Sequence, residues 1–233
     1  MNYFYICINL KSTIINIKMK KVILTLTIVA SLLVSCKGEK KEAVKASDAV
    51  TIENTVKVAN NVDIINSVIS WKGTKPTGSF HEGVVSLKEG SLTLENGNLV
   101  GGEFVINMNS IKNTDIKDAG KSAYLVKHLA SADFFEVEKY PTAKFVITSS
   151  EEKDNLLHVT GNLTVKDVTK SITIPAVVSK ADGIVTFKSE AFNINRADFN
   201  VKYKSKSFFS LKELKDKAID DLMGMSFEVK TTK

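Results

Sequence analysis

Hydrophobic and polar residues alternate through most of the chain from Val62 onward. A period of two is typical of β-strands that bury one face. In residues 156–166, Val159, Gly161, Leu163 and Val165 share one face. The same alternation predicts strands at residues 62–65, 68–73, 84–88, 91–94, 99–108, 145–148, 156–166, 172–178, 185–194 and 225–229.

Turn signals separate these strands at short intervals. Asn96-Gly97 predicts a tight hairpin, because both central residues of such a turn need a positive φ. Gly101-Gly102 favours a bulge or kink. The hydrophobic phase shifts between Phe187 and Phe192, which predicts a second bulge near Glu190.

The period changes to that of a helix in one place. Apolar residues at positions 119, 123, 126 and 130 keep near-helical spacing, and Tyr140-Pro141 ends the excursion before the next strand. A lesser helical excursion is predicted at residues 211–222. We therefore expect an all-β protein, an antiparallel up-and-down, extended lipocalin-like barrel of eight strands with a helical excursion between strands. Small inward residues at Gly161, Ala176 and Ser189 favour a cavity over a filled lumen.

The N-terminus has the features of an export signal. Basic residues 18–21 precede a short apolar run at residues 22–33, which ends in Leu33-Val34-Ser35-Cys36. This ending resembles a bacterial lipobox, in which the cysteine becomes the lipidated first residue. The alternative is an N-terminal anchor helix with an incidental cysteine. We expect a signal peptide at residues 1–35 with its true start at Met19, a lipidated Cys36 with a flexible tether over residues 36–61, and a barrel domain over residues 62–233.

Charge and cysteine content bear on possible partners and on disulfide bonds. The chain carries 32 basic and 26 acidic residues, a net charge of +6. Four of the lysines and none of the acids lie in residues 1–35, so residues 36–233 have 28 basic and 26 acidic residues, a net charge of +2. This near balance gives no reason to expect a nucleic-acid partner. Only Cys36 follows the signal peptide, so no disulfide is expected within the exported chain.

Motifs for catalysis or metal binding are incomplete. His81-Glu82 begins like the zinc-protease motif H-E-x-x-H, but Val85 occupies the second histidine position. His128 and His158 could join His81 only through the fold. Asp115 stands where a phosphate loop ending at residues 120–122 would need its first glycine. We therefore predict no catalytic residue, no metal and no cofactor, hence not an enzyme.

Several motifs together resemble the YceI-like family of exported lipid-binding proteins. Residues 128–135 read H-L-x-S-x-D-F-F, residues 140–145 read Y-P-x-A-x-F, and residues 161–164 read G-x-L-T. Trp71-Lys72-Gly73, residues 80–83 and residues 192–199 match as well, so the resemblance covers nearly all of residues 62–230. One departure is Asn200, where the family commonly has glycine after R-x-D-F. Asparagine tolerates a positive φ, so the turn is expected to survive. Asn107, where relatives often have aspartate, and the longer segment 211–217 put the headgroup end of the site in doubt.

The resemblance implies a lipocalin-like barrel that holds a polyisoprenoid, such as a polyprenyl or quinone tail. The alternating apolar residues would then form the wall, and Phe134 and Phe135 would line or close one end. The expected ligand-binding residues are Phe104, Ile106, Phe134, Phe135, Phe145, Ile147, Leu163, Val165, Ile172, Ile174 and Phe187.

Three hypotheses for function follow. The first is a membrane-tethered cell-envelope protein, on the periplasmic face or outer membrane, that carries or scavenges an apolar lipid. The second is an enzyme acting on such a lipid. The third is a packed barrel that serves as a stress-related interaction module. Which lipid binds, which leaflet holds the anchor and whether barrels form a homodimer stay open.

Overall fold

The computed structural model describes residues 42–51 and 59–233. The predicted signal peptide and Cys36 lie outside the described residues. Within the described residues, thirteen strand segments form one sheet. The long segments are β3 (Val68–Thr74), β4 (Phe80–Val85), β5 (Leu87–Glu95), β6 (Asn98–Asn107), β8 (Thr142–Lys153), β9 (Leu156–Val165), β10 (Val168–Ala181), β11 (Ile184–Ser189) and β13 (Leu222–Lys230). The short ones are β1 (Ser47–Asp48), β2 (Ala59–Asn61), β7 (Lys112–Asn113) and β12 (Phe192–Asn195).

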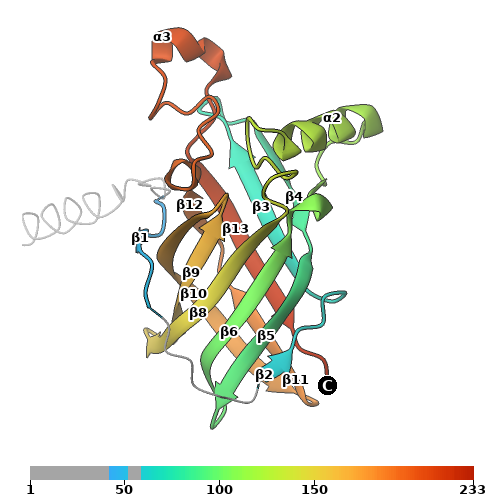
Figure 1. The fold of residues 1–233 in the computed structure, drawn as a ribbon, viewed down its shortest axis with the longest axis vertical. Helices are drawn as coiled ribbons and strands as arrows, with labels where there is room; N and C mark the ends of the chain where they lie inside the picture. Colours follow the sequence, from blue (N-terminus) through green and yellow to red (C-terminus); the bar gives the residue numbers. More distant parts are fainter. Residues whose placement is uncertain (1–41, 52–58) are drawn as a thin grey trace, which may run out of the picture. The chain divides into compact units, whose positions relative to one another are not determined.

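The sheet closes into a barrel, as Figure 1 shows. Strands β5, β6, β8, β9, β10, β11, β13, β3 and β4 pair in that order, each antiparallel to the next. β4 runs into β5 through Ser86, so one bent strand pairs with β3 at its start and with β6 at its end. Counting β4–β5 and β11–β12 as single strands gives eight, which confirms the predicted fold class. All the strand pairings that close the barrel lie within residues 59–233.

The predicted bulge near Glu190 is confirmed. β11 and β12 both pair with β13, but Lys188 faces Glu228 whereas Phe192 faces Met225, a shift of one residue. The N–H of Glu190 leaves the β13 ladder and donates to the carbonyl of Pro175 at 2.9 Å. The predicted hairpin is also present, with φ values of 52° at Asn96 and 86° at Gly97.

The middle of the barrel is filled by aromatic side chains. Phe104 contacts Phe187 with ring centroids 5.5 Å apart, and Phe227 contacts Phe145 at 5.6 Å and Phe192 at 5.5 Å. Rings at these separations pack edge to face or tilted, which is favourable beyond the area they bury. The lumen is therefore solid here.

One end of the barrel carries the helical segments. α2 (Ala119–Ala130) starts at Asp118, whose carboxylate accepts the N–H of Lys121 at 2.8 Å. α3 (Leu211–Leu214) and the 3-10 helix η3 (Lys215–Lys217) lie in the excursion before β13. Figure 1 places α2 and α3 at the same end. Two further 3-10 helices are η1 (Met108–Ser110) and η2 (Arg196–Phe199). η2 ends at Asn200 with a φ of 60°, so the asparagine keeps the left-handed turn as expected.

Residues 42–51 lie along the outside of the barrel. β1 pairs with β10, and the N–H of Val44 donates to the carbonyl of Asn193 at 2.7 Å. The side-chain amide of Asn162 bonds both backbone groups of Val50, at 2.9 and 2.8 Å. The sequence predicts a flexible tether over residues 36–61. In the structure, residues 42–51 are instead hydrogen-bonded to the barrel. Their partners, such as the side chain of Asn162, lie far away in the sequence, so no local pattern identifies them.

Candidate functional site: an apolar cavity under the second helix

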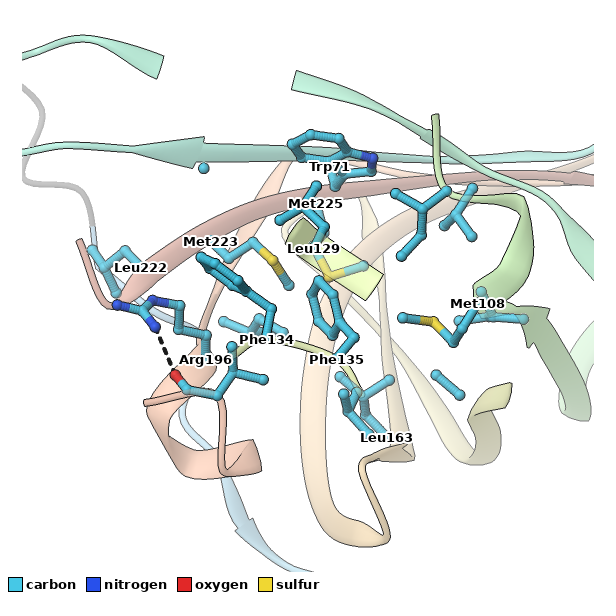
Figure 2. Close-up of a pocket in the computed structure, with 18 of the residues that line it drawn as sticks. Trp71, Met108, Leu129, Phe134, Phe135, Leu163, Arg196, Leu222, Met223 and Met225 are labelled. Carbon is cyan, nitrogen blue, oxygen red and sulfur yellow. Dashed lines mark hydrogen bonds between the residues drawn. The ribbon is translucent and has the colours of Figure 1, made fainter. Parts of the chain in front are cut away.

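A cavity of about 100 Å³ lies between the aromatic core and α2 (Figure 2). Leu129 from α2, together with Phe134 and Phe135 from the turn that follows, covers one side. The strands, the segment of η1 and Ile111 after β6, and the segment after β12 form the remaining wall. These residues are Trp71, Gly73, Val85, Ile106, Met108, Ile111, Ala143, Leu163, Val165, Ile194, Arg196, Val201, Ile219, Asp220, Leu222, Met223 and Met225.

The lining is apolar and adaptable. Met108, Met223 and Met225 contribute unbranched thioether side chains, which change shape at lower cost than branched or aromatic ones. Figure 2 shows Met223 and Met225 near the two phenylalanines. This chemistry suits an apolar chain of irregular outline.

The structure brings together five of the eleven predicted ligand-binding residues. Ile106, Phe134, Phe135, Leu163 and Val165 line the cavity. The other six lie in the packed core, each at most 3% exposed: Phe104, Phe145, Ile147, Ile172, Ile174 and Phe187. For these six, contact with a ligand stays a prediction.

Gly161 explains why the cavity does not extend deeper. A Cβ on Gly161 would lie 2.5 Å from Cζ of Phe145, so the phenylalanine ring occupies the space that the glycine leaves. In the sequence alone, the missing side chain of Gly161 favours a cavity. Only the fold shows that the ring of Phe145 fills this space. The space near α2 instead comes from the way the helix and its following turn cover the barrel end.

Sequence reasoning missed several lining residues. Trp71 appears there only as part of a family motif, and Met223 and Arg196 have no assigned role. A signal for the methionine exists, because Met223 shares a face with Met225, Phe227 and Val229 along the last strand. Arg196 gives no such signal, since a charged residue is not expected in a cavity wall.

Arg196 is 4% exposed and ties the segment before β13 to the barrel. Its Nη1 donates to the carbonyl of Val201 at 2.7 Å, the contact drawn in Figure 2. Nε donates to the carbonyl of Asp220 at 2.9 Å and Nη2 to that of Ile219 at 3.0 Å. Burial lowers the pKa of the guanidinium from its ordinary value, while Asp221 and Asp220 oppose that shift. Three carbonyls and a nearby carboxylate thus hold the cation.

Asp221 is the acidic partner of Arg196. Its Oδ1 lies 3.4 Å from Nη2 of Arg196, and its Oδ2 accepts the hydroxyl of Ser207 at 2.6 Å. The buried Oδ1 makes no hydrogen bond in the described part of the chain. Because the donors of Arg196 are aimed largely at the backbone, the pair shapes the cavity end more than it offers a free charge to a ligand.

Trp71 brings an unpaired polar atom to the cavity wall. Its Nε1 is buried and has no hydrogen-bond partner among the described residues. Gly83 on the neighbouring strand accommodates the ring, since a Cβ there would lie 2.7 Å from Cζ2 of Trp71. An unpaired buried N–H is costly, so an oxygen atom of a bound molecule would be a favourable acceptor.

A small aromatic cluster holds the cover of the cavity. His128 Nε2 bonds Asp133 Oδ2 at 2.8 Å, and the imidazole ring packs at 5.1 Å from the rings of both Phe134 and Tyr203. Phe134 also lies 5.1 Å from Tyr203. These contacts join the turn after α2 to the segment after η2.

The other histidines do not converge on a shared site. His81 Nδ1 bonds Asp115 at 2.9 Å, whereas His158 lies within β9. Within residues 42–51 and 59–233, no group of three or more metal-ligating side chains is clustered. Burial opposes ionisation of Asp115, but hydrogen bonds from the Glu82 N–H, His81 and Asn113 prevail and lower its pKa to about 2.

Within the described residues, no helix has both the length and the apolar character needed to cross a bilayer.

The fold and the cavity define the class of the protein. A closed, eight-stranded antiparallel barrel with an internal apolar cavity is lipocalin-like in architecture. The model of the YceI-like domain matches residues 59–231, and the chain belongs to that family.

Individual relatives agree with this assignment over part of their length. Protein YceI of Escherichia coli O157:H7 is 40% identical over 81 residues, 33% of this chain and 42% of that protein. A Pseudomonas putida protein is 43% identical over 83 residues, 33% of this chain and 43% of that protein. The matched region therefore spans less than half the length of these relatives.

Solved structures share the fold at low identity. A polyisoprenoid binding domain from Saccharophagus degradans aligns with a TM-score of 0.57 and 16% identity, covering 75% of this chain and 98% of that one. BcnA from Burkholderia cenocepacia aligns with a TM-score of 0.54 and 20% identity, covering 73% of this chain and 99% of that one.

Proposed function

We propose that this protein binds a long apolar lipid of the polyisoprenoid or quinone type and acts as a carrier or scavenger without chemical conversion. The apolar cavity under α2 is the observation that carries the proposal. Family membership and the description of the Saccharophagus degradans domain as polyisoprenoid binding support the choice of ligand. Burial of the chain would supply about 25 cal/mol per Å² of apolar area.

The size of the cavity bears on how the ligand enters. Typical ligand pockets measure about 300–1,000 Å³, so the cavity of about 100 Å³ accepts only part of a long chain. A longer chain needs the methionines, or the cover formed by Leu129, Phe134 and Phe135, to move. Ligand binding would then push into the packed core, where the six deeper predicted residues lie.

We also propose that the protein is exported and anchored to a membrane through a lipidated Cys36. The basic segment, short apolar run and lipobox-like ending of residues 18–36 support this. Two or more acyl chains at about 0.8 kcal/mol per buried methylene would make the attachment lasting.

A second function has its own supporting observation. The packed aromatic cluster around Phe104 and Phe227 fills the middle of the lumen, as a barrel without a ligand would require. An interaction module of this kind would use its outer surface and would leave the cavity empty.

Mass spectrometry of an organic extract tests the two functions. Residues 37–233, purified from a bacterium, should release about one isoprenoid per protein. Ala143→Phe, which adds a ring at the cavity wall, should abolish that release. Val177→Phe adds the same ring to an exposed position on β10 and should leave it unchanged.

Circular dichroism and thermal unfolding must show that both variants fold. An empty extract, together with no uptake of added polyprenol or quinone by the folded protein, would exclude the carrier function. Equal release from the two variants would place the ligand outside this cavity.

A further inference from the structure

The two segments that cover the cavity also present aromatic side chains to solvent. Tyr124 on α2 is 73% exposed, and Phe208 and Phe209, in the segment before α3, are 50% and 45% exposed. Several exposed Tyr and Phe side chains together are costly to leave in water. Such residues are typical of surfaces that contact a partner or a membrane interface.

Lysines surround these aromatic residues. Residues 202–217 contain six lysines and two acidic residues, a net charge of +4. The remainder of residues 36–233 therefore carries 22 basic and 24 acidic residues, a net charge of −2. Lys202 lies 4.6 Å over the Phe208 ring, and exposed Lys121 and Lys127 flank Tyr124 at helical spacing of three.

Acidic residues near this surface are largely engaged. Asp133 pairs with His128 at 2.8 Å, and Glu136 lies 3.7 Å from Lys166. Glu213 accepts the N–H and hydroxyl of Ser210 at 2.8 and 2.6 Å. The lysines of residues 202–217 take part in none of these three contacts, and this segment keeps its net charge of +4.

Each segment has one side on the cavity and the other in solvent. α2 places Leu129 in the cavity and Tyr124 outside, while residues 201–222 place Val201, Ile219 and Leu222 in the cavity and Phe208 outside. Figure 1 shows α2 and α3 at one end of the barrel. The exposed basic and aromatic residues therefore lie on the two segments that cover the cavity.

We propose that this surface, formed by Tyr124, Lys121, Lys127 and residues 202–217, docks on an anionic lipid bilayer. Lysines would bind the lipid phosphates, and the aromatic rings would enter the headgroup region. Docking orients the covered end of the cavity toward the membrane, where an apolar ligand can pass without crossing water. The inference extends the proposed function but does not depend on which ligand the cavity holds.

Vesicle co-sedimentation tests the docking surface. The probe is residues 37–233, which lack the cysteine, with phosphatidylcholine vesicles or vesicles containing about one third phosphatidylglycerol. We expect binding to the anionic vesicles only. Lys202→Gln with Lys206→Gln should weaken it at least tenfold, given about 1 kcal/mol per lysine. Phe208→Ser with Phe209→Ser should weaken it by a similar factor.

Matched variants at the opposite end provide the controls. Lys153→Gln with Lys180→Gln removes the same charge near the far turns, and Ile64→Ser with Ile65→Ser removes another exposed apolar pair. Both should leave vesicle binding unchanged. No binding to anionic vesicles, or equal losses in the control variants, would overturn the proposal. Weaker binding of the lysine variant, with unchanged binding of the phenylalanine variant, would overturn the entry of the rings into the headgroup region and leave a purely electrostatic contact.

Discussion

At the scale of single residues, Trp71 and Arg196 provide the polar atoms of the cavity in different ways. Arg196 directs its N–H groups to the carbonyls of Val201, Asp220 and Ile219, so its role is to position the chain around the cavity. Trp71 keeps one buried N–H that has no partner in the part of the chain that the structure describes. A ligand oxygen would therefore gain more from Trp71 than from the arginine.

Trp71→Phe should separate this hydrogen bond from packing. The variant keeps an aromatic ring but loses the N–H, so affinity for a polyprenol should fall about fivefold, or about 1 kcal/mol. Affinity for the corresponding hydrocarbon without oxygen should stay the same. Fluorescence displacement titration measures both. Equal losses for the two ligands would show that the indole acts through its shape.

Asp115 makes a separate prediction about pH. Its pKa is lowered to about 2 in the folded state from an ordinary value near 3.8, so its stabilisation is present above about pH 4 and is lost as pH falls toward 2. Asp115→Asn should remove a pH-dependent contribution of order 1 kcal/mol to the free energy of unfolding in this pH range. Urea denaturation between about pH 2 and 6 measures how the free energy of unfolding changes with pH. Asp154→Asn, in an exposed turn, should not change it.

At the scale of elements, the packing of β8 against β9 decides how deep the cavity reaches. Phe145 lies across Gly161, and the ring closes the lumen at that level. Farther along, α2 and the turn after it cover the remaining space with Leu129, Phe134 and Phe135. The solid and hollow parts of the barrel thus follow from which element supplies the inward side chain.

Gly161→Ala should destabilise the barrel by about 1–3 kcal/mol, because its Cβ would lie 2.5 Å from Phe145 and 2.8 Å from the carbonyl of Val146. In the background of Phe145→Leu, the cost should drop. Urea denaturation of the four proteins of this double-mutant cycle measures the coupling. Gly224→Ala, whose Cβ would have no neighbour closer than 3.5 Å, should cost less. Additive effects at positions 145 and 161 would contradict this packing.

At the scale of the whole molecule, lipid binding, anchoring and docking are separate proposals that act on one barrel. The anchor would hold the protein at a membrane, and the surface around Phe208 would orient it there. The hydrogen bonds of Asn162 to Val50 attach residues 42–51 to the barrel, so these residues do not behave as the flexible tether that the sequence predicts.

Cys36→Ser tests the anchor. Without the thiol no acyl chain can be attached, so the exported protein should move from the membrane fraction to the soluble fraction in a wash of high salt, which also releases contacts made by charge. Metabolic labelling with palmitate should label the protein that has Cys36 and not the Cys36→Ser variant. Labelling that persists in Cys36→Ser would contradict lipidation at this position.

The sequence by itself determined the long strands, the bulge near Glu190, the hairpin at Asn96-Gly97 and the turn at Asn200, whereas the strand that it predicted at residues 62–65 is wrong, because the chain bends after Val62. These are local properties, because alternation and backbone preference act between near neighbours. Its family motifs also indicated the barrel, and alternation within the strands placed Ile106, Leu163 and Val165 in the wall. Alternation did not distinguish these three from Phe104 and Phe187, since all five alternate with the same period and face the same interior.

The tertiary structure alone decided where that interior is full and where it is hollow. Gly161 predicts space in the sequence, yet Phe145, sixteen positions earlier, occupies that space in the fold. Arg196, Ile219 and Trp71 meet at one cavity although they are distant in the chain. The free volume depends on contacts between side chains from different elements, and no periodicity within one element records those contacts.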